Sequence, residues 1–143
     1  MVGIAAYDHV GIRVSDRSRS IGFYQRLGFQ IDPEFTDERV AEMVTPAGVR
    51  INLIFNGVPQ NGARNILLDD PVKLPGFTHA AFVVDDLETI LRWAAAEGTA
   101  LTEGPVDWGR RITCFLRDPD GNVLEFNQLV SRLSGNGKSG GGQ

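Results

Sequence analysis

The chain has 143 residues, of which 42% are hydrophobic and 22% charged, and such a chain buries roughly two thirds of its unfolded surface without disulfides or a structural metal. The formal net charge of -4 argues against nucleic acid as a partner, and no apolar run approaches the roughly 20 residues that cross a membrane. A single cysteine and no secretory leader pattern predict a cytoplasmic protein.

The first half of the chain is predicted to be a βαβββ module at about 5–56. A short strand is expected at 9–14, and the carboxylate of Asp16 can cap the first N–H groups of the helix that follows. Gly28 supplies the permissive backbone that ends this helix. Two further strands are expected at 40–44 and 49–55, joined by a Pro-Ala-Gly turn.

The second half, at about 77–130, shows the same order of elements. A segment at 57–76 with little periodicity precedes it, and this segment is either a connector or a loop over a site. We expect residues 1–132 to form a single domain and the Gly/Ser-rich residues 133–143 to be a disordered tail. The predicted elements of this half are strands at 77–84, near 100, at 112–117 and at 122–128, with a helix at 86–97.

The two halves align with each other as an internal repeat. Residues 8–29 align with 78–99, which places His9 on His79. A second match aligns TPAGVRINLIF with DPDGNVLEFNQ, which places Asn52 on Glu125. The predicted fold class is therefore α+β, with two tandem βαβββ modules forming a curved, mixed β-sheet cup and the helices on its outer face.

Alternation of side chains along the strands predicts which residues share a face. His9, His79, Asn52 and Glu125 each lie opposite the apolar residues of their own strand and should face the cup. The same parity, continued through the hairpins, adds a second group unless a bulge inverts it. This group consists of Glu42 and Arg50 beside Asn52, and of Arg111, Thr113 and Phe115 beside Glu125.

Two imidazoles and one carboxylate on three strands of one face are the ligand set of a facial triad with open positions. The sequence therefore predicts a divalent metal ion, Fe, Mn, Ni, Co or Zn, bound by His9, His79 and Glu125. These are the only two histidines in the chain, and they occupy equivalent positions in the repeat. The alternative is that Arg13 or Arg111 neutralises Glu125 and that the histidines are ordinary hydrogen-bonded strand residues.

The paired modules, with His9 in DHVGIRV, His79 in THAAFVV and Glu125 in DPDGNVLEF, resemble the vicinal oxygen chelate superfamily, also called the glyoxalase/bleomycin-resistance/dioxygenase superfamily. The resemblance covers residues 5–130. It implies a divalent metal at these three positions, a small-molecule substrate that chelates the metal through neighbouring oxygens, and a homodimer. The reaction it implies is of the lyase or isomerase kind.

Other subfamilies remain as alternatives. Glyoxalase-I-like enzymes usually have Glu or Gln where this chain has Asn52, which cannot act as a base, although its amide oxygen could touch the metal. A small extradiol-type dioxygenase would have the same ligand set, but this chain has no further histidine for proton transfer. The remaining alternative is an antibiotic-resistance protein, which would either sequester a drug-like ligand or transfer a thiol to it.

Glu42 and Glu125 are the candidate catalytic carboxylates. Glu42 is the base candidate for proton abstraction, and the alternative for it is an ion pair with Arg50. Cys114 shares parity with the helix-packed side and is expected to be a buried, inert thiol, and Tyr24 is expected in the helix core. Candidate substrate contacts are Arg13, Arg50 and Arg111 for an anion, Asn52 and Thr113 as polar groups, and Trp108 and Phe115 as an apolar wall.

Overall fold

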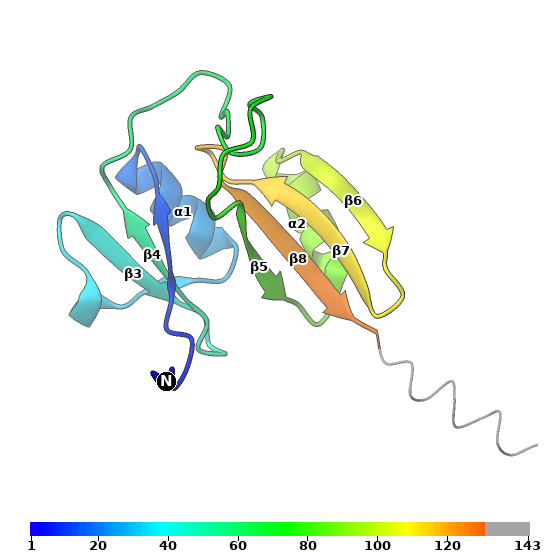
Figure 1. Ribbon diagram of the computed structural model, residues 1–143, viewed down its shortest axis with the longest axis horizontal. Helices are drawn as coiled ribbons and strands as arrows, with labels where there is room; N and C mark the ends of the chain where they lie inside the picture. Colours follow the sequence, from blue (N-terminus) through cyan, green and yellow to red (C-terminus); the bar gives the residue numbers. More distant parts are fainter. Residues whose placement is uncertain (131–143) are drawn as a thin grey trace, which may run out of the picture. The chain divides into compact units, whose positions relative to one another are not determined.

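The computed structural model describes residues 1–130, so the predicted disordered tail at 133–143 lies outside the described residues. The described chain consists of two units, each an α+β arrangement of one helix and a four-stranded mixed sheet (Figure 1). Unit 1 contains residues 1–74 together with 118–122, and unit 2 contains residues 75–117 and continues from residue 123. The predicted fold class is confirmed.

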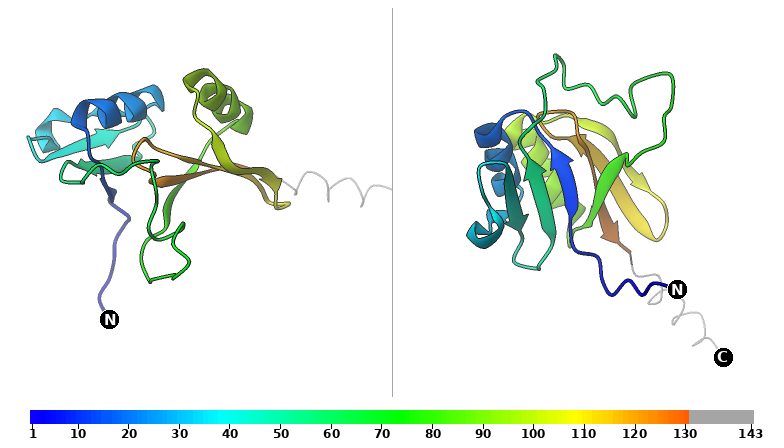
Figure 2. Two further views of the ribbon diagram at one scale, coloured as in Figure 1. Left: turned by 90° about the horizontal axis from the view of Figure 1, so that it is seen from above. Right: turned by 60° about the vertical axis from the view of Figure 1, so that its left-hand side comes forward.

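Unit 1 contains one βαβββ module, in which a 3-10 helix at Pro33–Phe35 follows the second strand. The strand order in the sheet is β1-β4-β3-β2, with β1 parallel to β4 and the other pairs antiparallel. Helix α1 covers one face of this sheet (Figure 2). The elements are β1 (Val10–Arg13), α1 (Arg17–Arg26), β2 (Gln30–Ile31), β3 (Val40–Val44) and β4 (Arg50–Ile54).

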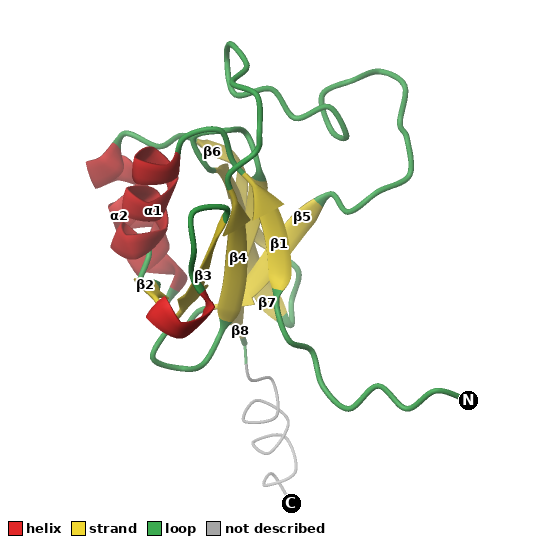
Figure 3. Ribbon diagram, turned by 90° about the vertical axis from the view of Figure 1, so that its left-hand side faces the viewer, coloured by secondary structure: helices red, strands yellow, loops and turns green. Residues whose placement is uncertain are grey.

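Unit 2 repeats this topology. Its strand order is β5-β8-β7-β6, again with a single parallel pair, β5 and β8. Helix α2 packs on β7 and β8 and covers one face of the sheet, and Figure 3 shows the two helices in red and the strands in yellow. The elements are β5 (His79–Val83), α2 (Leu87–Glu97), β6 (Leu101–Asp107), β7 (Arg111–Arg117) and β8 (Val123–Leu129).

The two helices begin in the same way. Asp16 and Asp86 have extended backbone conformations, and their carboxylates accept hydrogen bonds from the N–H of Arg19 and Glu88. Such caps satisfy N–H groups that have no partner within the helix. The predicted cap at Asp16 is confirmed, and its repeat-equivalent Asp86 caps the second helix.

The predicted alternation of faces is also confirmed. Ile51 and Leu53 in β4 are fully buried, while Asn52 between them is only half-buried. The register pairs Glu42 with Asn52 and Phe115 with Glu125, as parity through each hairpin predicts. The bulges that could have inverted this parity occur between β6 and β7, outside these pairs.

The DPDG turn at 118–121 is held within unit 1 by a buried carboxylate. Asp118 accepts hydrogen bonds from the N–H groups of Asp120 and Asn122, from the Asn122 side chain and, at 2.8 Å, from the hydroxyl of Tyr24. Burial raises the pKa of Asp118, and the hydrogen bonds from Asn122 and Tyr24 act against that rise. Tyr24 is therefore in the helix core, as predicted, and also joins α1 to this turn.

The segment after β4 is anchored on the same turn. The side-chain amide of Asn65 donates a hydrogen bond to the carbonyl of Gly121 at 3.1 Å. Gly121 has a φ of +87°, and a Cβ there would lie 2.0 Å from the carbonyl oxygen of Ala63, so only glycine fits. None of the helices in residues 1–130 has the length and apolar character that a membrane crossing demands.

Cys114 is fully buried in β7, as predicted, and burial raises its pKa to about 11. At pH 8 about one thiol in a thousand would then be the reactive thiolate. We therefore expect no reaction with a disulfide reagent such as Ellman's reagent in the native protein at pH 8, and one equivalent after unfolding in guanidinium. Rapid labelling of the native protein would contradict a closed core around β7.

Candidate functional site

His9 precedes β1 in unit 1, and both of its ring nitrogens face polar side chains. Nδ1 lies 2.5 Å from the Asp8 carboxylate, which can only accept a hydrogen bond when ionised. Nε2 lies 3.1 Å from Asn52. The Asn52 amide satisfies its surroundings when its nitrogen donates to Glu42 Oε1 at 2.9 Å, and its oxygen then faces His9 Nε2.

Glu42, which contacts Asn52, also forms an ion pair with Arg50. Arg50 Nη1 lies 2.6 Å from Glu42 Oε2 and 2.9 Å from Asp32 Oδ2. Hydrogen bonds to Asp32 and Glu42 raise the pKa of the Arg50 guanidinium against the effect of desolvation. The ion pair considered for Glu42 from the sequence is therefore present, and Asp32 is a partner that the sequence analysis did not find.

Arg13 lies apart from this group. Its Nε donates a hydrogen bond to the side-chain oxygen of Asn56 at 2.9 Å, and its side chain is exposed. The structure thus brings His9, Asn52, Glu42 and Arg50 together in unit 1 and places Arg13 outside that cluster.

In unit 2, His79 lies beside Glu125. The distance from His79 Nε2 to Glu125 Oε1 is 3.7 Å, and the other ring nitrogen, Nδ1, lies 2.8 Å from the hydroxyl of Thr78. The ring of Phe115 stands edge-to-face against the imidazole, with 5.6 Å between centroids. These contacts fix the plane of the ring and direct Nε2 toward the carboxylate.

Glu125 has a second partner, Asn127, that the sequence analysis missed. The side-chain amide of Asn127 donates to Glu125 Oε2 at 2.8 Å, and the Thr113 hydroxyl donates to the Asn127 oxygen at 2.6 Å. Strand parity could have found Asn127, because a residue two positions after Glu125 shares its face.

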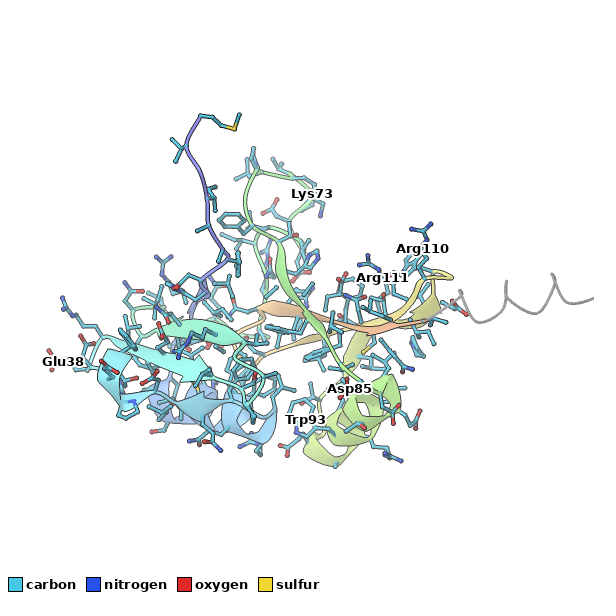
Figure 4. All side chains as sticks on the ribbon, turned by 90° about the horizontal axis from the view of Figure 1, so that it is seen from below. Glu38, Lys73, Asp85, Trp93, Arg110 and Arg111 are labelled. Atoms are coloured by element: carbon cyan, nitrogen blue, oxygen red, sulfur yellow. The ribbon has the colours of Figure 1, made fainter. Side chains whose placement is uncertain are left out.

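Trp108 and Arg111 lie at the β6–β7 hairpin. The backbone N–H of Trp108 donates to the carbonyl of Arg111 at 2.9 Å, and the Trp108 side chain is exposed. Figure 4 shows Arg111 and its neighbour Arg110 projecting from this hairpin. Phe115 and Thr113 therefore adjoin the His79–Glu125 pair, whereas Trp108 and Arg111 form the tip of the hairpin.

Each unit taken by itself places two donor atoms at a separation that suits ligands of one divalent cation. The Asn52 oxygen lies 3.1 Å from His9 Nε2 and accepts a hydrogen bond when that nitrogen carries the ring proton; in the other tautomer, the lone pair of Nε2 and the Asn52 oxygen are both donors to a cation. Two ligands of one ion at metal distances of about 2.1 Å lie about 3–3.4 Å apart, close to the separation seen for His9 with Asn52 and for His79 with Glu125. No cluster of three or more His, Cys, Asp or Glu side chains within residues 1–130 is arranged to hold a metal.

Comparison with known proteins identifies the fold and the relatives. A family model described as "Glyoxalase/Bleomycin resistance protein/Dioxygenase superfamily" matches residues 6–126. A lactoylglutathione lyase of Haemophilus influenzae is 31% identical over 90% of this chain and 96% of its own length. A virulence protein of Salmonella typhimurium is 29% identical, over 86% of this chain and 83% of its own length.

Solved structures with the same fold cover most of the chain. The crystal structure of the Salmonella typhimurium virulence protein matches with a TM-score of 0.65 and 25% identity, over 90% of this chain and all of that one. A glyoxalase/dioxygenase from Nostoc punctiforme matches with a TM-score of 0.69 and 18% identity, over 92% of this chain and all of that one. The second match bears on the fold alone.

Proposed function

Because this chain belongs to the Glyoxalase/Bleomycin resistance protein/Dioxygenase superfamily, we propose that it is a metal-dependent enzyme that carries out lyase or isomerase chemistry on a small oxygenated substrate. One observation carries the proposal. The two histidines at equivalent positions of the repeat each have Nδ1 beside a side chain of the preceding residue and Nε2 beside an oxygen donor, Asn52 or Glu125. Two half-sites of the same design are what a duplicated metal-binding fold requires.

The residues that we propose to hold the ion are His9, His79 and Glu125, and the amide oxygen of Asn52 is a further donor. When bound, a divalent ion would polarise a substrate oxygen and stabilise negative charge that develops there. Glu125 supplies one full negative charge, and the imidazoles supply neutral nitrogen ligands, a combination suited to Fe, Mn, Ni, Co or Zn.

Glu42 is a candidate for proton transfer, and its contacts define how it would act. Each of its oxygens accepts a hydrogen bond, one from Asn52 and one from Arg50. A base in this position would have to exchange one of these partners for the substrate proton. The contacts equally support a positioning role, because Glu42 accepts from the Asn52 amide nitrogen at 2.9 Å and so directs the amide oxygen toward His9.

Substrate contacts in this proposal come from groups that the described structure leaves accessible. Trp108 is exposed, as are the side chains of Arg13 and Arg111, and a guanidinium suits a carboxylate or phosphate of the substrate. Phe115 lies against His79 and would give an apolar wall beside the metal.

The proposal is tested with protein that has been treated with a chelator. Adding Mn²⁺, Ni²⁺, Co²⁺ or Zn²⁺ at about 100 times its Kd should stabilise the fold by about 2.7 kcal/mol, which corresponds to a rise in Tm of about 10 °C. The metal-loaded protein is then assayed for formation of lactoylglutathione from the adduct of glutathione with methylglyoxal, since a lactoylglutathione lyase is a 31% identical relative. No Tm shift with any of these ions would contradict the proposal.

A second candidate function is sequestration of a small ligand without turnover. The observation that favours it is that Asn52 carries no acid–base group and that both oxygens of Glu42 are engaged within unit 1. A protein of this kind would bind its ligand equally well with and without chelator. If the ligand bound only in the presence of a metal ion, the result would favour the metal-dependent enzyme over sequestration.

We also propose that the protein is a homodimer. Phe77 and Val83, at and near β5, are apolar and highly exposed in the single chain, at 97% and 64%. Apolar side chains that are this exposed in the single chain would be covered in an interface with a second copy. Sedimentation should therefore give twice the chain mass of 15.6 kDa.

A further inference from the structure

Three polar side chains form a chain of hydrogen bonds on one face of β7 and β8. Thr113 and Asn127 lie directly opposite each other in the antiparallel register, and Glu125 precedes Asn127 by two residues on the same strand. Thr113 is 2% exposed and Asn127 is 3% exposed. A buried amide at a position that could hold an apolar side chain calls for a reason, because leaving its donors and acceptor unpaired is unfavourable.

The partners on its two sides, Thr113 and Glu125, decide which way the Asn127 amide points. The Thr113 hydroxyl donates its one proton to the Asn127 oxygen at 2.6 Å, so the amide nitrogen must face the other way. That nitrogen donates to Glu125 Oε2 at 2.8 Å. The donor and the acceptor of both hydrogen bonds are therefore defined, and the last acceptor in the series is the Glu125 carboxylate.

The two oxygens of the Glu125 carboxylate have different partners. Oε2 is occupied by Asn127, whereas Oε1 is the oxygen 3.7 Å from His79 Nε2. Glu125 has only 16% of its side chain exposed, so few other groups compete for it. One oxygen is held by the protein, and the other is directed to the imidazole.

We propose that Thr113 and Asn127 are positioning residues, which hold Glu125 so that Oε1 alone is presented to a metal ion beside His79. This inference rests on the proposed function and deepens it. Thr113 thus acts through Asn127 and Glu125, and its 2% exposure accords with a role away from the substrate. Partners of this kind orient a ligand before the ion arrives, and their loss typically weakens metal binding about 10–100-fold.

The test compares two substitutions at one position. Thr113→Val keeps the shape of the side chain but removes the hydroxyl, whereas Thr113→Ser keeps the hydroxyl. We expect Thr113→Val to weaken Mn²⁺ or Zn²⁺ binding, measured by calorimetry, by about 10–100-fold and Thr113→Ser to stay within about threefold of the original protein. A purely structural role would instead lower the Tm of both metal-free variants and leave the Kd unchanged.

A second readout uses the unaltered protein and needs no substitution. On titration with Zn²⁺, the side-chain amide signal of Asn127 in a ¹H–¹⁵N NMR spectrum should shift as Glu125 becomes a ligand, whereas that of the exposed Asn61 should not. An Asn127 signal that does not move, or a Thr113→Val variant with the original Kd, would overturn this inference alone. Absence of metal binding by the unaltered protein would overturn the proposed function and the inference with it.

Discussion

Replacing Asp118 with alanine is expected to lower the free energy of unfolding by about 4 kcal/mol. The carboxylate is 2% exposed and accepts hydrogen bonds from Tyr24, Asp120 and Asn122. Without it, two backbone N–H groups, an amide and a phenol lose their common acceptor, and each buried donor left unpaired is unfavourable. Urea unfolding followed by circular dichroism measures the difference.

Tyr24→Phe is the matched control for that prediction. It removes only the 2.8 Å hydrogen bond from the phenol and keeps the ring, which packs edge-to-face against Phe23 and Phe29. A loss of about 2 kcal/mol is expected for a single hydrogen bond to a charged group. If Asp118→Ala lost no more than Tyr24→Phe, the turn would not depend on the shared carboxylate.

The pH dependence of the Asp118 effect has a definite sign. Because burial raises its pKa, the folded protein keeps a proton that the unfolded chain has already released. Asp118 therefore contributes most stability below the ordinary Asp pKa of about 4 and loses that contribution as the pH rises through the raised value. The difference in unfolding free energy between the original protein and Asp118→Ala should widen as the pH falls toward 4.

Replacing Glu125 with glutamine is expected to weaken binding of a divalent ion by more than about 100-fold. Loss of a residue that only hydrogen-bonds a metal ligand weakens binding by at most about 100-fold, and loss of the ligand itself should exceed that. The substitution keeps the size of the side chain and removes its negative charge, which the two neutral imidazoles do not replace. Calorimetric titration of chelator-treated protein with Mn²⁺ or Ni²⁺ gives the Kd.

The matched control is Glu103→Gln, which removes an exposed carboxylate from β6 of the same sheet. Its Kd should remain within a factor of about two of the original, because an exposed charge is screened by solvent. Equal losses for the two variants would mean that the metal responds to net charge and not to a ligand at position 125.

The sequence and its repeat were sufficient to predict the module order, the helix cap at Asp16 and the faces of the strands. These features follow from local periodicity, and equivalent positions such as Asp16 and Asp86 support each other. The two-residue strand β2 could not be located, because two residues show no alternation.

Long-range partners were harder to predict than faces. The bond between Tyr24 and Asp118 joins residues 94 positions apart, and neither hydropathy nor spacing marks the pair. Asp32 as a partner of Arg50 comes from a loop whose path the pattern does not define. Asn127 was within reach of the parity argument, but only a contact to Glu125 distinguishes it from an ordinary strand asparagine.

The most direct measurement of the central claim is the number of metal ions bound per chain by the protein and by its His9→Ala and His79→Ala variants, determined by elemental analysis after dialysis against a divalent metal. The account predicts one ion per chain in the original protein and a small fraction of an ion in each variant, with all three proteins folded by circular dichroism. Retention of a full equivalent of metal by both variants would show that the histidine pair does not bind the ion.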